Sequence, residues 1–195
     1  MVWLALMVSG GEMRSKFAIQ GHPLHPLLVT VPIGLLVWTL AADFIFLATD
    51  ELIWFEIARW TGVAAIVSAL LAALPGFGDY LTMSFAGKAR QAATAHMLLN
   101  LTVVGAYIAA ALFMFSTAVG IEGDELSATF VYTATGLHAF GVALLLVSGW
   151  LGGEMVYRYR LGVMTEATTG ADGLSGRRPR PAREAQRVER ERAAE

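Results

Sequence analysis

Four long apolar stretches dominate the sequence, and each is long enough to cross a lipid bilayer. They lie near Leu24–Ala48, Thr61–Met83, Ala92–Val119 and Thr129–Gly153. About 20 apolar residues in a helix span the roughly 30 Å of hydrocarbon in a bilayer. Hydrophobic residues make up 56% of the chain and charged residues 15%, a composition typical of membrane proteins. The sequence therefore predicts an integral membrane protein.

The connections between these stretches are short, which fixes the expected fold class. Helices joined by short loops pack antiparallel to their neighbours in sequence. Small residues recur within the second and third stretches, and in lipid they allow close approach of helix backbones. We therefore expect an all-α, up-down bundle of four transmembrane helices.

Basic residues indicate the orientation of the bundle. They flank the stretches on one side of the membrane, at Arg14, Lys16, Lys88, Arg90, Arg158 and Arg160. The opposite connections carry Asp50, Glu51, Glu56, Glu122, Asp124 and Glu125, with Arg59 as their only basic residue. Because positive charge accumulates on the cytoplasmic side, we expect a multi-pass protein of the bacterial inner membrane with both termini in the cytoplasm.

Composition divides the chain into three parts. Residues 1–20 form a short lead-in that lacks the pattern of a signal peptide, and residues 21–163 form the transmembrane domain. Residues 164–195 are rich in Arg and Glu and hold few large apolar side chains. Such a segment buries too little surface to offset its ordering entropy, so we expect a disordered cytoplasmic tail.

Several functional classes lack their signature here. The chain has no cysteine, which excludes disulfides, Cys-ligated zinc or iron–sulfur sites and Cys-attached haem. There is no phosphate loop, no dinucleotide fingerprint and no nucleophile next to a base. We therefore predict no catalytic site and no nucleic-acid partner, and any metal must be bound by His, carboxylate, Met or Tyr.

Two of the four histidines lie at the water edge of the first stretch, in Gly21–Pro26. His22 and His25 are three residues apart, so they share a face if the segment is helical. Pro23 and Pro26 suit a first helical turn and stiffen it. A stiff histidine pair could bind a metal, or it could simply cap the helix and meet headgroups and water.

The third stretch offers a histidine at the same depth. His96 and Asn100 share a helix face, and His96 lies about one turn inside the boundary. If the first and third helices are diagonal neighbours, His25 and His96 could hold a b-type haem or a transition metal, with His22, Asp79 and Glu154 as further ligands or supporting acceptors. The alternative is an interhelical hydrogen-bond network without metal.

His138 lies near the middle of the fourth stretch, about 20 Å from the cytoplasmic end. This height does not match that of His25 or His96. We expect a neutral histidine bonded to a carbonyl or a hydroxyl, for example that of Tyr107 or Thr102, and a proton-path role is the alternative. Asp43, toward the outer end of the first stretch, is expected to be structural.

Five pieces of the chain together resemble a family of predicted four-helix bacterial membrane proteins called domain of unknown function 2231. They are Gly21–Pro26, Asp79-Tyr80-Leu81, His96 with Leu98-Leu99-Asn100, Gly152–Tyr157 and Gly162-Val163. Relatives are sometimes joined to a Rieske-type iron–sulfur domain, and this resemblance implies electron transfer. Where relatives often have a histidine followed by glycine after the closing tyrosine, this chain has Tyr159 and Arg160.

These observations favour an accessory or scaffold subunit in the lipid bilayer, whose histidines bind one another and the backbone. The alternative is an electron-transfer subunit with haem b or a transition metal at His25 and His96. A third function is transport of protons or a small solute through His138 and Asp43, but four helices offer little room for a pathway unless the protein forms oligomers. The expected partners are a redox protein, other membrane subunits or further copies of the chain.

Overall fold

The computed structural model describes residues 15–84, 86–119 and 128–162. Its elements are β1 (Ala18–Ile19), β2 (His22–Pro23), α1 (Leu24–Leu28), α2 (Thr30–Thr49), α3 (Leu52–Thr82), α4 (Gly87–Val119) and α5 (Ala128–Tyr157). The predicted disordered tail, the first 14 residues and the acidic connection of Glu122, Asp124 and Glu125 lie outside the described residues.

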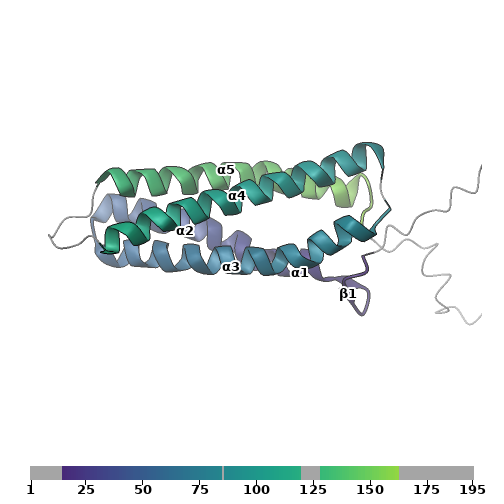
Figure 1. The fold of residues 1–195 in the computed structure, drawn as a ribbon, viewed down its shortest axis with the longest axis horizontal. Coiled ribbons are helices and arrows are strands. Elements are labelled where there is room, and N and C mark those ends of the chain that lie inside the picture. The colour runs from purple at the N-terminus through teal and green to yellow at the C-terminus, as the bar shows by residue number, and fades with distance from the viewer. Residues whose placement is uncertain (1–14, 85, 120–127, 163–195) are drawn as a thin grey trace, which may run out of the picture. The chain divides into compact units, whose positions relative to one another are not determined.

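The described residues include four helical segments that are long and apolar enough to span a membrane. They are Leu24–Thr49, Leu52–Thr82, Gly87–Ser116 and Ala128–Tyr157, and each contains an 18-residue window of mean hydropathy 1.8 or more. The predicted all-α fold with four spans is confirmed. The helices run up and down the bundle (Figure 1), as their short connections predict.

The second helix begins nine residues before its predicted start. α3 starts at Leu52, two residues after the left-handed C-cap of α2 at Asp50, whose φ is 56°. Glu56 and Arg59, assigned to a loop from the sequence, therefore lie inside α3, where they form an ion pair. Hydropathy locates the apolar core of a span, whereas a helix continues through the polar interface as long as its backbone hydrogen bonds are made.

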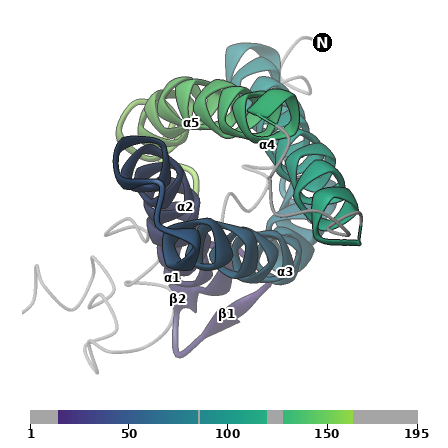
Figure 2. The same ribbon diagram turned by 90° about the vertical axis from the view of Figure 1, so that its left-hand side faces the viewer.

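Viewed along the bundle, the helices follow one another around a ring in the order α2, α3, α4, α5 (Figure 2). α2 packs mainly against α3, and α4 mainly against α5. We call these the first and second hairpins. The first span (α1 and α2) therefore lies diagonally opposite α4, and polar contacts between these two cross from one hairpin to the other.

Small side chains bring the helices together. Ala42, Ala58, Ala65 and Ala110 are fully buried, one or two from each of α2, α3 and α4. Larger residues fill the space around them in two clusters, one including Phe46, Phe55 and Met114, the other Leu36, Val103 and Leu145. Because lipid is as apolar as leucine, close packing of this kind, not exclusion from water, holds the helices together.

A small hairpin precedes the first helix and changes the position of one predicted ligand. β1 and β2 are antiparallel, with Ala18 opposite Pro23 and Ile19 opposite His22. Gln20 and Gly21 form a two-residue turn with φ values of 49° and 82°, as in the tight turns that join twisted strands. Since α1 begins only at Leu24, His22 lies before the helix and does not share a helical face with His25.

The first span is interrupted at Val29, between α1 and α2. Pro32 has no backbone N–H to donate to the carbonyl of Leu28, four residues earlier. The interruption lies next to that carbonyl, as is usual for a proline within a helix. The break separates the short α1, which carries His25, from the long α2.

Candidate functional site

His25 lies against the backbone of α3. Its Nδ1 is 2.8 Å from the carbonyl oxygen of Ala72. Gly76, one turn further along, allows this approach, because a Cβ there would come within 2.6 Å of Nδ1. Pro75, buried inside α3, removes the helical hydrogen bond that would end at Leu71 and thus loosens this turn. The sequence analysis did not identify Pro75 or Gly76 as part of the site.

His96 lies against α5 in a similar way. Its Nδ1 is 2.9 Å from the carbonyl oxygen of Ser148 and 3.0 Å from the hydroxyl of the same residue. Gly152, one turn further along α5, leaves room for the ring, since a Cβ there would be 3.3 Å from Cε1 of His96. Each imidazole is thus seated beside a helical glycine and bonded to a backbone carbonyl.

These carbonyl contacts determine which ring nitrogen carries the proton. A carbonyl oxygen only accepts hydrogen bonds, so Nδ1 of each neutral histidine must be the donor. Nε2 then keeps its lone pair. This is the arrangement found in metal-bound histidines, where a second hydrogen bond orients the ring and fixes its tautomer.

Asn100 lies next to Nε2 of His96, the ring nitrogen that carries no proton. Its amide nitrogen is 2.7 Å from the hydroxyl oxygen of Ser148, 2.8 Å from the carbonyl oxygen of His96 and 3.2 Å from Nε2 of His96. An amide group has two N–H donors for these three acceptors. The two shorter contacts use both donors, so the contact with Nε2 is the one most easily given up.

The two imidazoles meet across the bundle. The ring centroids of His25 and His96 are 6.4 Å apart and the ring planes are nearly perpendicular, at 89°. The expectation that these histidines lie level with each other is confirmed. With metal–nitrogen distances of about 2 Å, two imidazoles that share a metal ion have ring centres about 5–6.5 Å apart, depending on the angle at the metal. The role of the pair as ligands stays a prediction.

The other three predicted ligands have partners or surroundings of their own, and their role as metal ligands stays a prediction. His22 is exposed on β2. Asp79 binds the segment before β1, because its carboxylate accepts hydrogen bonds from the hydroxyl of Ser15 and the backbone N–H of Lys16. Glu154 pairs with Arg158 at 3.3 Å. Among the described residues, no three His, Asp or Glu side chains are grouped so as to hold a metal ion.

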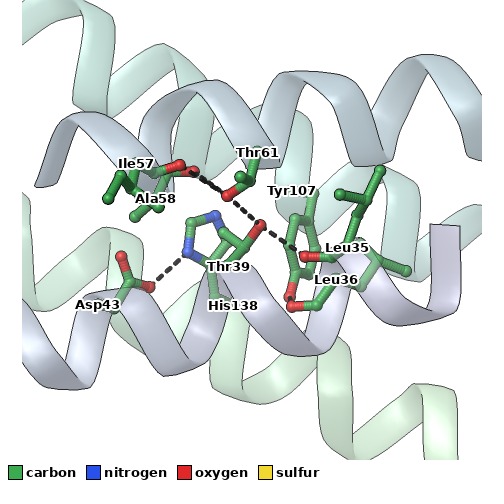
Figure 3. Close-up of polar contacts among 9 residues, drawn as sticks. All are labelled: Leu35, Leu36, Thr39, Asp43, Ile57, Ala58, Thr61, Tyr107 and His138. Carbon is green, nitrogen blue, oxygen red and sulfur yellow. Dashed lines mark hydrogen bonds and ion pairs between the residues drawn. The ribbon is translucent and has the colours of Figure 1, made fainter. Parts of the chain in front are cut away.

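A second polar cluster lies farther along the bundle, at His138 of α5 (Figure 3). Nδ1 of His138 is 2.6 Å from Oδ2 of Asp43 on α2, and both side chains are almost completely buried. The sequence analysis expected a hydroxyl or carbonyl partner instead. The hydroxyl of Tyr107 donates to the carbonyl of Leu36 at 2.7 Å, and that of Thr102 donates to the carbonyl of Leu98.

Tyr107 contacts the histidine with its ring instead. The ring centroids of Tyr107 and His138 are 4.4 Å apart and their planes are inclined by 31°. Gly141 makes this possible, because a Cβ at that position would lie 2.7 Å from Cε2 of Tyr107. Beside these rings, the hydroxyls of Thr39 and Thr61 are 3.0 Å apart and link α2 to α3.

Comparison with known proteins agrees with the membrane fold. No curated protein and no solved structure matches the chain. A family model described as "Predicted membrane protein (DUF2231)" matches residues 21–165. This range contains the His25–His96 pair and the polar cluster at His138. The chain therefore belongs to the DUF2231 family of predicted membrane proteins.

Proposed function

We propose that this protein is an accessory membrane subunit that binds a metal-centred redox group, a b-type haem or a single transition-metal ion, through His25 and His96. The observation that supports this proposal is that the two imidazoles are held in the same way and lie close to each other. Each is bonded through Nδ1 to a backbone carbonyl, which leaves Nε2 as the ligand atom, and the ring centroids are 6.4 Å apart.

The residues around the pair fit a metal in three respects. Both ligands would be neutral imidazoles, which suit iron, copper and zinc. Their orientation is fixed by hydrogen bonds before a metal arrives, so little conformational entropy is lost on binding. Asn100 can release Nε2 of His96 and keep two hydrogen bonds. When bound, iron or copper would supply a one-electron redox centre within the bundle.

The main competing function is that of a scaffold without a metal. It is favoured by the same hydrogen bonds, because Nδ1 of each histidine has a protein partner and Asn100 contacts Nε2 of His96. In that case the two histidines would only link α1 to α3 and α4 to α5. The two functions differ in one measurable property, which is the presence of a metal.

An absorption spectrum and a metal analysis of the detergent-purified protein test the proposal. We expect a Soret band or stoichiometric metal, either as purified or after addition of haem, copper or iron. His25→Ala and His96→Ala should each lower metal affinity by at least about 100-fold, more than the loss of an outer hydrogen-bonding partner. His22→Ala is the matched control, since His22 is exposed on β2, and should retain the metal.

Two results would contradict the proposal and favour the scaffold. One is a folded protein that stays colourless and metal-free after addition of each candidate. The other is metal binding that survives both His25→Ala and His96→Ala.

A further inference from the structure

The ligand atoms of the proposed metal pair carry no formal charge. They are Nε2 of His25 and Nε2 of His96, each on an imidazole whose Nδ1 is bonded to a backbone carbonyl. Asn100, whose side chain lies next to Nε2 of His96, is a neutral amide. Within the described residues, no carboxylate is grouped with the two rings so as to complete a metal site. An ion bound by this pair would therefore keep its full charge.

The charge of the ion decides how costly its binding is. Both rings are half-buried between helices, and the free energy needed to move an ion out of water grows with the square of its charge. A divalent ion with two neutral ligands is therefore far more costly than a monovalent ion. Zinc sites in proteins supply three or four side chains, and the pair supplies two.

The separation of the rings also favours an ion that takes two ligands. Their centroids are 6.4 Å apart, near the upper end of the range of about 5–6.5 Å for two imidazoles on one metal. The upper end corresponds to a nearly straight angle between the two metal–nitrogen bonds, whereas a tetrahedral ion would bring the rings closer together. Copper(I) and silver(I) are monovalent, have filled d shells and commonly bind two nitrogen ligands in a straight line.

Two methionine side chains lie beside the pair. Met83 and Ala93 form a buried cluster, and Met155 packs against it. Ala93 is one helical turn before His96 on α4, and Met155 is one turn after Gly152, which contacts the His96 ring. Both thioethers are thus about one turn from His96, toward the end of the bundle. Thioether sulfur is a soft ligand that selects copper(I), so these neighbours favour the same ion.

A single ion also needs less space than a haem. The rings of His25 and His96 meet edge to face, with their planes at 89°, and the amide nitrogen of Asn100 is 3.2 Å from Nε2 of His96. A porphyrin would have to enter between the rings and move the two hairpins apart. An ion would displace only the contact of Asn100 with Nε2.

We propose that the His25–His96 pair is a copper(I) site, in which Nε2 of both imidazoles binds the ion in a nearly linear arrangement. This inference rests on the function proposed above and names its metal ion and oxidation state. Copper(II) prefers a tetragonal set of ligands, which the pair does not supply, and its second charge would be uncompensated. Copper bound at the pair should therefore be held in its reduced form.

Metal titration of the full chain in detergent micelles tests this choice of ion. We expect one copper(I) per chain, measured under reducing conditions against a competing chelator, and one silver(I), which has the same charge and preferred geometry. Zinc(II) and copper(II) should bind to the pair at least about 100-fold more weakly, because their second charge is uncompensated. Zinc(II) that binds to the pair as tightly as copper(I) would overturn the inference.

Silver(I) also identifies the ligand atoms, because its complex is diamagnetic. In nuclear magnetic resonance of the full chain labelled with ¹⁵N-histidine, silver(I) should shift the Nε2 signals of His25 and His96, while Nδ1 of each keeps its proton. The signals of His22 and His138 should not change. X-ray absorption of the copper(I) form should show two nitrogen ligands. Four ligands at the copper, or binding through Nδ1, would contradict the linear site.

One substitution should change the preferred ion. Asn100→Asp places a carboxylate next to Nε2 of His96, so the ratio of copper(I) affinity to zinc(II) affinity should fall by at least about tenfold. Gln91→Glu is the matched control, because it makes the same chemical change at an exposed position of α4 and should leave the ratio unchanged. An unchanged ratio in folded Asn100→Asp would count against the role of charge. If this variant does not fold, the titration of the unaltered protein decides.

The results distinguish a failure of this inference from a failure of the proposed function. A haem or an iron ion bound through His25 and His96, with no copper(I) bound there, would refute the copper(I) site and leave the function proposed for the pair standing. A folded protein that binds neither metal nor haem would refute both. Copper(I) binding that survives His25→Ala and His96→Ala would also refute both, because the ion would then be bound elsewhere.

Discussion

Gly76 of α3 lies where the imidazole of His25 meets the helix, and no side chain fits between them. A Cβ on Gly76 would be 2.6 Å from Nδ1 and 2.9 Å from Cε1 of His25. The ring and the α3 backbone are therefore in direct contact. The position of His25 and its distance from His96 therefore depend on a residue that has no side chain.

Replacement of this glycine tests the dependence. Gly76→Ala should push the His25 ring from the Ala72 carbonyl and lower the free energy of unfolding in detergent by about 1–3 kcal/mol, the usual cost of overpacking. The metal affinity predicted for the His25–His96 pair should fall as well. Gly105→Ala is the matched control, because nothing lies within 4 Å of its Cβ position. It should be neutral or stabilise the helix by up to about 1 kcal/mol.

A double-mutant cycle measures the coupling between Asp43 and His138. Asp43→Ala alone should reduce the free energy of unfolding by about 3 kcal/mol, because it leaves a buried histidine without its partner. Asp43→Ala combined with His138→Phe should cost less than the sum of the two single changes. Strictly additive losses would show that the two side chains do not interact.

The carboxylate of Asp79 should hold the segment before β1 in place. It accepts hydrogen bonds from Ser15 and from the backbone N–H of Lys16. Asp79→Asn should weaken these bonds by about 1–2 kcal/mol and speed amide hydrogen exchange in residues 15–19. Metal affinity should not change, and a loss of metal in this variant would support the prediction from the sequence that Asp79 is a ligand.

The ion pair of Glu154 and Arg158 should contribute little. Their side chains are 31% and 64% exposed and 3.3 Å apart, and exposed pairs of this spacing are worth about 0.3–0.5 kcal/mol. Glu154→Gln should therefore shift the unfolding midpoint only slightly. A change as large as that of Asp43→Ala would indicate that Glu154 has a partner other than Arg158.

The sequence predicts the membrane class, the four spans and the common level of His25 and His96. The class and the spans follow from hydropathy, and the common level follows from counting residues from each helix end. Neither step requires knowledge of how the helices pack. The partner of His138 requires more information. It depends on how far α2 and α5 are rotated about their axes and shifted along them, and the two helices share a buried cluster that includes Ala42 and Ala134.

Local backbone geometry explains why His22 does not share a helical face with His25. Its spacing from His25 suggests a shared helical face, but Gln20 and Gly21 adopt positive φ and turn the chain into a strand pair before the helix starts. Gln20 is not a residue that usually favours this conformation. The turn therefore has no clear signal in the sequence, and the role of His22 as a ligand stays a prediction.

Contacts at two different heights along the bundle join the two hairpins and limit how far one can shift along the other. His25 reaches His96 from one hairpin to the other, and Asp43 reaches His138 farther along. A shift of one hairpin along the other by one helical turn, about 5.4 Å, would break both contacts together. If the chain were cut between residues 119 and 128, the two halves should still recognise a single alignment when they reassemble.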